Sequence, residues 1–133
     1  MGATMEFTKF EGVTFNAKDK KAYFAISAIK TTMTTESSKT SGDDVKLATL
    51  NAGAVYEVSL GLDTTIGSEW VPKSMWAPTP LIGSDLSTKD SEGNSAVIDK
   101  IANPDNVKFS ESMRTLFIGE DSGMHLNNYV WAY

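Results

Sequence analysis

The sequence predicts an all-β fold of antiparallel strands, and three observations support this prediction. Short runs rich in Val, Phe, Tyr and Ile alternate with polar turns along the chain, which is typical of β-hairpins. Pro72, Pro78 and Pro80 exclude a long helix from the middle of the chain. One strand–turn–strand pattern also occurs twice, once near each end of the sequence, as expected for stacked sheets.

The first copy of this pattern begins with a hairpin. Its predicted strands cover residues 11–16 and 22–28, and they flank a charged turn at residues 17–21. Residues 31–44 are polar and without periodicity, which predicts a loop. A third strand is predicted over residues 54–60.

The middle of the chain gives weaker signals. Residues 69–71 and 74–76 fit either strands or an aromatic flap, and residues 83–94 are predicted to form a polar loop. One short helix is expected at residues 95–101. Its length is too small to change the fold class.

The second copy repeats the first with an offset of 94 residues, so that Val13 aligns with Val107. Its last strand aligns residues 129–132 with residues 55–58. We therefore expect residues 1–133 to form a single β unit, a partial β-propeller of about two blades with long loops. The blade-like repeats would lie at residues 9–60 and 101–133. Because two blades cannot close a ring, a homo-oligomer or the remainder of a longer propeller chain would supply the missing strands.

Composition limits the functions to consider. The 133 residues carry a net charge of −5, which argues against a nucleic acid or an anionic membrane as partner. Without cysteine the chain forms no disulfide and offers no thiolate to a metal. No stretch has the length of a signal core or a membrane span.

A candidate site follows the strand that ends at Glu120. This glutamate shares a strand face with Leu116 and Ile118, where a carboxylate is costly unless it is paired or bound to a metal. Asp121 points the other way and is interpreted as a turn cap. His125, the only histidine, is interpreted as a structural hydrogen-bonding residue.

Two further residue types receive structural interpretations. The only arginine, Arg114, lies in a predicted hairpin turn, which indicates exposure to solvent. The three tryptophans are too dispersed to form a stacking platform for bases, and we expect them to pack in the core; they are Trp70, Trp76 and Trp131.

Three stretches of the sequence resemble the PhoX family of calcium-dependent bacterial alkaline phosphatases. The most specific is Arg114-Thr-Leu-Phe-Ile-Gly-Glu-Asp-Ser-Gly-Met-His125 with the following residues 127–133. The segment Lys9-Phe-Glu-Gly-Val-Thr-Phe15 is similar to the metal-binding Glu-Gly strand of that family, and residues 51–56 are similar to a third stretch.

The resemblance implies a β-propeller with calcium and iron ions at its centre, which hydrolyses phosphate monoesters in the periplasm or outside the cell. Glu11 and Glu120 fall where such enzymes have metal-ligating carboxylates. Lys9 falls near the position of a phosphate-holding arginine and is the expected catalytic residue, although lysine lacks the bidentate fork of arginine. We expect this chain alone to lack the full site, because other family ligands, including a cysteine, have no counterpart here.

Two other functions remain open at this point. The chain could be a non-catalytic β-propeller fragment or oligomeric structural module. It could also belong to another metal-dependent propeller hydrolase, such as a lactonase, because those enzymes also line a central channel with carboxylates.

Overall fold

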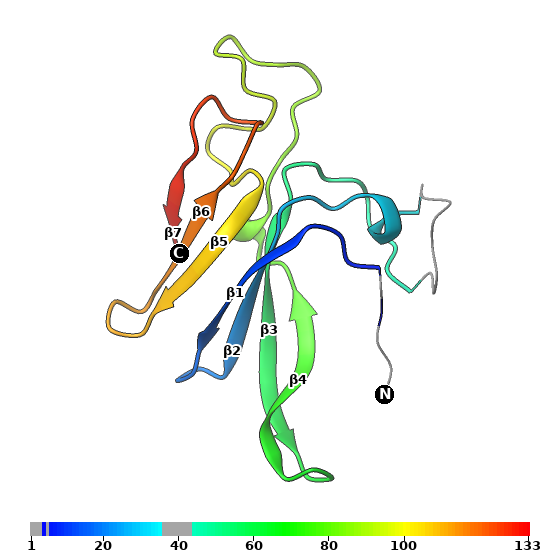
Figure 1. The fold of residues 1–133 in the computed structure, drawn as a ribbon, viewed down its shortest axis with the longest axis vertical. Coiled ribbons are helices and arrows are strands. Elements are labelled where there is room, and N and C mark those ends of the chain that lie inside the picture. The colour runs from blue at the N-terminus through cyan, green and yellow to red at the C-terminus, as the bar shows by residue number, and fades with distance from the viewer. Residues whose placement is uncertain (1–3, 5, 36–43) are drawn as a thin grey trace.

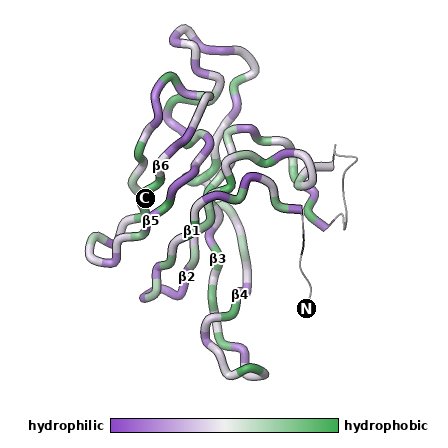
Figure 2. The backbone as a smooth tube through the Cα atoms, viewed as in Figure 1, coloured by the Kyte–Doolittle hydropathy of each residue, from purple (hydrophilic) through white to green (hydrophobic). Residues whose placement is uncertain are grey.

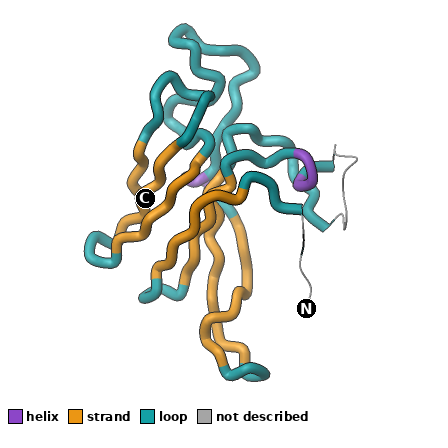
Figure 3. Tube along the Cα trace, in the orientation of Figure 1, coloured by secondary structure: helices purple, strands orange, loops and turns teal. Residues whose placement is uncertain are grey.

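The computed structural model describes residue 4, residues 6–35 and residues 44–133. They form two antiparallel sheets and almost no helix (Figures 1 and 3). The larger sheet has the order β1-β2-β3-β4, with strands at Phe10–Asn16, Lys21–Ile26, Ala54–Asp63 and Ser68–Trp76. The smaller sheet has the order β5-β6-β7, with strands at Pro104–Ser110, Thr115–Glu120 and Val130–Ala132. The all-β prediction is confirmed.

The hairpins β1–β2 and β5–β6 share one register. Phe15 pairs with Ala22, and their counterparts 94 residues later, Phe109 and Leu116, pair in the same way. Both hairpins carry an irregularity near the start of their first strand. The third strands, β3 and β7, also correspond to each other. Val55 pairs with Ala25 of β2, and Val130 pairs with Gly119, the counterpart of Ala25 in β6. Val55 is therefore equivalent to Val130, and the predicted alignment was off by one residue.

The two hairpin turns are built alike. The Asn16 side chain accepts a hydrogen bond from the Asp19 amide at 3.1 Å, and the Ser110 hydroxyl accepts one from the Met113 amide at 3.3 Å. The residue before the returning strand is left-handed in both turns, with φ of 51° at Lys20 and 53° at Arg114. Polar side chains that bind the backbone locally stabilise such turns.

Arg114 is exposed to solvent, as predicted, and it also links the two turns. Its guanidinium donates to Glu111 at 2.5 Å and to Asn16 at 3.2 Å, and it also pairs with Asp19. It lies 5.0 Å above the Phe109 ring. The arginine therefore helps to hold the two hairpins together.

The core lies between the two sheets. The smaller sheet packs on one face of the larger one, where β5 contacts β1 and β2 (Figure 1). Tyr23 stacks on Phe109 with ring centroids 6.0 Å apart, and Thr14 accepts a hydrogen bond from the Phe109 amide at 3.0 Å. The other buried residues of this core cluster are Val55, Leu81, Ile101, Leu116 and Ile118. Hydrophobic and hydrophilic residues are interspersed along the strands (Figure 2), and β2 is apolar on both faces after Lys21.

Some local predictions were wrong. Residues 95–101 form turns and bends in place of the expected helix, because they connect a bridge at Ala96 to β5. The two short helices are 3₁₀ turns elsewhere, at Thr31–Met33 and Thr79–Leu81. Residues 69–76 are one strand, β4, at the edge of its sheet, where Pro72 is tolerated. The predicted loop at residues 31–44 lies partly outside the described residues.

The tryptophans differ from the expectation of core packing. Trp131 packs against the core cluster, whereas Trp70 and Trp76 are exposed on β4. Within the described part of the chain, no helix is both long and apolar enough to cross a membrane.

Candidate functional site

A polar pocket of about 540 Å³ lies where the first strands of the two hairpins begin. It is lined by charged and amide side chains from both repeats: Lys9, Glu11, Lys30, Asn51, Asn103, Asp105 and Asp121. Ligand pockets usually have volumes of a few hundred cubic ångströms and a few convergent polar groups. This pocket has both properties, and we treat it as the candidate site.

The pocket is lined by matching positions of the two repeats. Lys9 corresponds to Asn103, Glu11 to Asp105, and Ser27 to Asp121, each pair 94 residues apart. The backbone repeats the correspondence, because Ser27 donates to the Lys9 carbonyl at 3.0 Å and Asp121 donates to the Asn103 carbonyl at 3.2 Å. The site therefore follows from the way the repeats pack.

Lys9 and Asn103 both have left-handed backbones, with φ of 51° and 45°. A positive φ is unfavourable for a residue with a side chain, although asparagine tolerates it better than lysine. These positions start the strands that carry Glu11 and Asp105. The backbone conformation thus fixes where both acidic side chains leave the sheet.

Asparagine side chains build a rigid wall of the pocket. The Asn103 amide donates to the carbonyls of Ser27 and Asn51, each at 2.8 Å. Asp85 in turn accepts from the backbone and side-chain amides of Asn51 and from the Ala52 amide, at 2.7 to 2.9 Å. This network joins the two repeats through side chains and backbone, so the wall is preorganised.

The charges in the pocket are unbalanced. The Lys9 ammonium lies 3.0 Å from a Glu11 carboxylate oxygen, and Lys30 is the second cation of the lining. The lining also holds three carboxylates, those of Glu11, Asp105 and Asp121. At neutral pH the lining therefore carries one net negative charge, which favours a bound cation and disfavours a free anion.

Glu120 belongs to a different environment. It is buried on the face of β6 that carries Leu116 and Ile118, as predicted. One carboxylate oxygen accepts from the Ala102 amide at 2.8 Å and from the Trp131 indole at 2.7 Å. The other lies 2.9 Å from His125 Nδ1 and accepts from the Tyr129 amide at 3.2 Å.

These four contacts satisfy Glu120 without a metal ion. His125 holds the carboxylate and also lies 3.3 Å from the Val97 carbonyl through Nε2, so its interpretation as a structural hydrogen-bonding residue is confirmed. Lys9 and Glu11 are brought together in the pocket, whereas Glu120 faces the packed side of its sheet. A metal at Glu120 would have to displace one of its present partners.

The described residues by themselves do not fit a calcium or iron site. No group of three or more His, Asp or Glu side chains among them is arranged to hold a metal ion, and calcium normally takes six to eight oxygen ligands. The ligand roles of Glu11 and Glu120 therefore stay predictions.

Sequence reasoning missed most of the pocket residues, including the two acids Asp105 and Asp121. Asp105 was not singled out, and Asp121 was interpreted only as a turn cap. The repeat offset was the signal that could have found Asp105, because it maps Glu11 onto that position. Gly12 allows β5 to pack closely on β1, because a Cβ there would lie 2.5 Å from the Asp105 carbonyl oxygen.

Comparisons of this chain with protein-family models, with curated proteins and with solved structures find no match.

Proposed function

We propose that this chain forms part of a metal-dependent phosphomonoesterase similar to the PhoX alkaline phosphatases, and that the polar pocket receives the phosphate group. The two sheets would then be two blades of a propeller. The observation that supports this function best is that Lys9 and Glu11 meet two further acids, Asp105 and Asp121, in one preorganised pocket.

Lys9 is suited to exchange its partner for a phosphate oxygen. Its side chain is about half exposed, and an exposed ion pair contributes only about 0–1 kcal/mol. A phosphate dianion can therefore compete with Glu11 for the ammonium group. Lys30, which also lines the pocket, would supply a second positive charge.

The negative net charge of the lining makes a divalent cation necessary for phosphate to bind. Phosphoester hydrolysis by this class of enzyme uses cations to neutralise phosphoryl oxygens. Since the described residues do not complete a metal site, the remaining ligands would come from outside them. In the chain alone, phosphate oxygens and water would supply the calcium ligands that the described residues lack, so the chain would bind phosphate in the presence of calcium but turn over little substrate.

Isothermal titration of the 133-residue chain with inorganic phosphate, with and without calcium, tests this function. We expect binding only with calcium, and we expect Lys9→Met to weaken it at least tenfold. Lys89→Met is the matched control, because Lys89 lies outside the pocket lining. Phosphate binding that ignores calcium, or that is equally strong in Lys9→Met, would contradict the proposal.

The second candidate is a non-catalytic, oligomeric structural module. It is favoured by one specific observation, an open apolar face on the larger sheet.

A further inference from the structure

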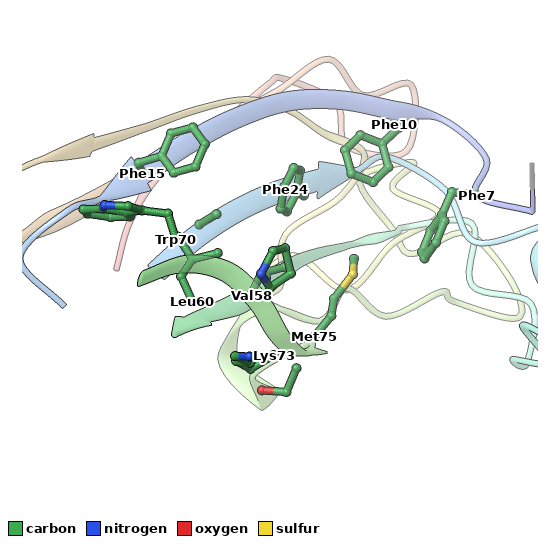
Figure 4. Close-up of a pocket in the computed structure, with 12 residues that line it drawn as sticks. Phe7, Phe10, Phe15, Phe24, Val58, Leu60, Trp70, Lys73 and Met75 are labelled. Atoms are coloured by element: carbon green, nitrogen blue, oxygen red, sulfur yellow. The ribbon is translucent and has the colours of Figure 1, made fainter. Parts of the chain in front are cut away.

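The face of the larger sheet that points away from the core is an apolar groove of about 680 Å³ (Figure 4). Phe15 and Trp70 lie at one end of the groove, and Phe7 and Met75 lie at the other. Apart from Lys73 and Ser74, the lining is apolar or aromatic. Large contiguous apolar patches are rare on proteins that act as isolated monomers.

The internal repeat identifies what kind of surface this groove is. Three of its residues, Phe15, Ala22 and Phe24, correspond to Phe109, Leu116 and Ile118 in the smaller sheet, each 94 residues later. Those three counterparts are buried in the core, where they pack against the larger sheet. The groove is therefore the equivalent packing face of the larger sheet, and none of the described strands covers it.

The matching receiving face is open on the smaller sheet. In the larger sheet, the residues that receive the smaller one include Tyr23, Ala25 and Val55. Their positional counterparts are Phe117, Gly119 and Val130, so apolar character is kept. Val130 is 77% exposed, and Phe117 and Gly119 are partly exposed.

We propose that the groove binds the outer face of the β5–β6–β7 sheet of a second copy of this chain, in a head-to-tail arrangement. Each contact between copies would repeat the contact between the two sheets within one copy. Such a heterologous interface uses two different surfaces of the chain and produces rings or open chains. Pairing groove against groove is disfavoured because two concave surfaces cannot fill each other.

Charge is consistent with this partner. The groove carries one cationic lining residue, Lys73, whose ammonium is 4.0 Å from Asp63, and the outer face contributes the apolar side chains named above. The outer face also carries Lys108, which is exposed and pairs with Phe117 across β5 and β6, so its ammonium has to stay at the solvated rim of the contact. Apart from these two lysines, the contact is of the apolar kind found in permanent assemblies.

Analytical ultracentrifugation of the purified chain tests the proposal. We expect the wild type to form assemblies larger than a monomer. Phe15→Asp in the groove and Val130→Asp on the outer face should each block association. An equimolar mixture of the two variants should form a one-to-one dimer, because each variant keeps one of the two complementary faces.

Controls separate association from folding. Far-UV circular dichroism of each variant should match the wild type, and Ile66→Asp, at an exposed turn outside both faces, should assemble normally. If Phe15→Asp loses its structure, Trp70→Ser tests the same groove from β4. A wild-type chain that is monomeric at every concentration, or a Val130→Asp variant that associates like the wild type, would overturn the proposal.

Discussion

The hairpins β1–β2 and β5–β6 have the same register and the same turns, yet opposite faces of them are buried. Phe109 is 7% exposed because it lies between the sheets, whereas its counterpart Phe15 is 56% exposed on the groove. Identical local geometry thus gives two different environments. The repeat therefore sets the shape of each hairpin, and the packing of the sheets decides which face becomes part of the core.

A second pair of equivalent residues also lies in two different environments. Ile26 ends β2 and is fully buried among apolar residues, whereas Glu120 at the equivalent position ends β6 and is buried with hydrogen-bond partners. The apolar end is covered by the segment around Met33, and the polar end by residues that include His125. The two equivalent positions therefore hold side chains of different kinds, one apolar and one a hydrogen-bonded carboxylate.

The largest expected effect comes from truncating the two equivalent phenylalanines. Phe109→Ala should lower the free energy of unfolding by about 3–5 kcal/mol, because it leaves a cavity in the core. Phe15→Ala should change it by about 1 kcal/mol or less, as for exposed positions. Urea unfolding of both variants, at concentrations where the chain is monomeric, measures the difference. Equal losses would mean that the two faces are equally buried.

Next in size is the buried carboxylate of the smaller sheet. Glu120→Gln should lower the free energy of unfolding by about 2–3 kcal/mol. The new amide NH₂ would face N–H donors and leave buried groups unpaired. The exposed Glu92→Gln is the control and should be nearly neutral. Unfolding is measured with and without calcium, since a loss that appears only with calcium would identify Glu120 as a metal ligand and not as a structural acceptor.

The larger sheet has an ion pair where the smaller sheet has Thr115 and Ala132. The Lys21 ammonium lies 2.8 Å from the buried Glu57 carboxylate. Lys21→Met should therefore lower the free energy of unfolding by about 2 kcal/mol. This is less than the usual loss for a fully buried ion pair, because Lys21 is partly exposed. Urea unfolding at neutral pH measures it. The exposed Lys18→Met should be nearly neutral.

The same pair predicts an alkaline effect. The hydrogen bond to Glu57 raises the pKa of Lys21 above its ordinary value of 10.5. A raised pKa stabilises the fold below the ordinary value, and this contribution is lost as the pH rises through the raised value. The wild type should therefore lose more stability than Lys21→Met above pH 10.5. If the free energy of unfolding fell equally with pH in the wild type and in Lys21→Met, the ion pair would not have this role.

The smallest effect concerns Gly119, whose counterpart in the larger sheet is Ala25. A Cβ at Gly119 would meet Asn106 at 3.8 Å, an ordinary contact, and alanine loses less backbone entropy than glycine on folding. Gly119→Ala should therefore stabilise the chain by about 0.5 kcal/mol in thermal or urea unfolding. A loss of stability would show that the outer face of β6 is more crowded than the hairpin comparison indicates.

Sequence reasoning predicted most strands and the repeat, because strand propensity and turn chemistry are local properties. It selected Lys9 and Glu11 as site residues, and both line the polar pocket, while their catalytic and metal-binding roles stay predictions. It could not place Asp105 beside them, since that contact depends on β5 crossing β1. It also assigned Trp70 and Trp76 to the core, because hydrophobicity alone does not say whether a sheet face is covered.

By itself, the sequence determined the all-β class, the two hairpins and their 94-residue offset. Alternating side chains and turn residues encode these features within a few positions of one another. Only the tertiary structure decided which face of each sheet is buried, which acids share a pocket, and that Glu120 is held by hydrogen bonds. Those outcomes depend on how two sheets pack, and packing joins residues far apart in the chain whose proximity leaves no local pattern.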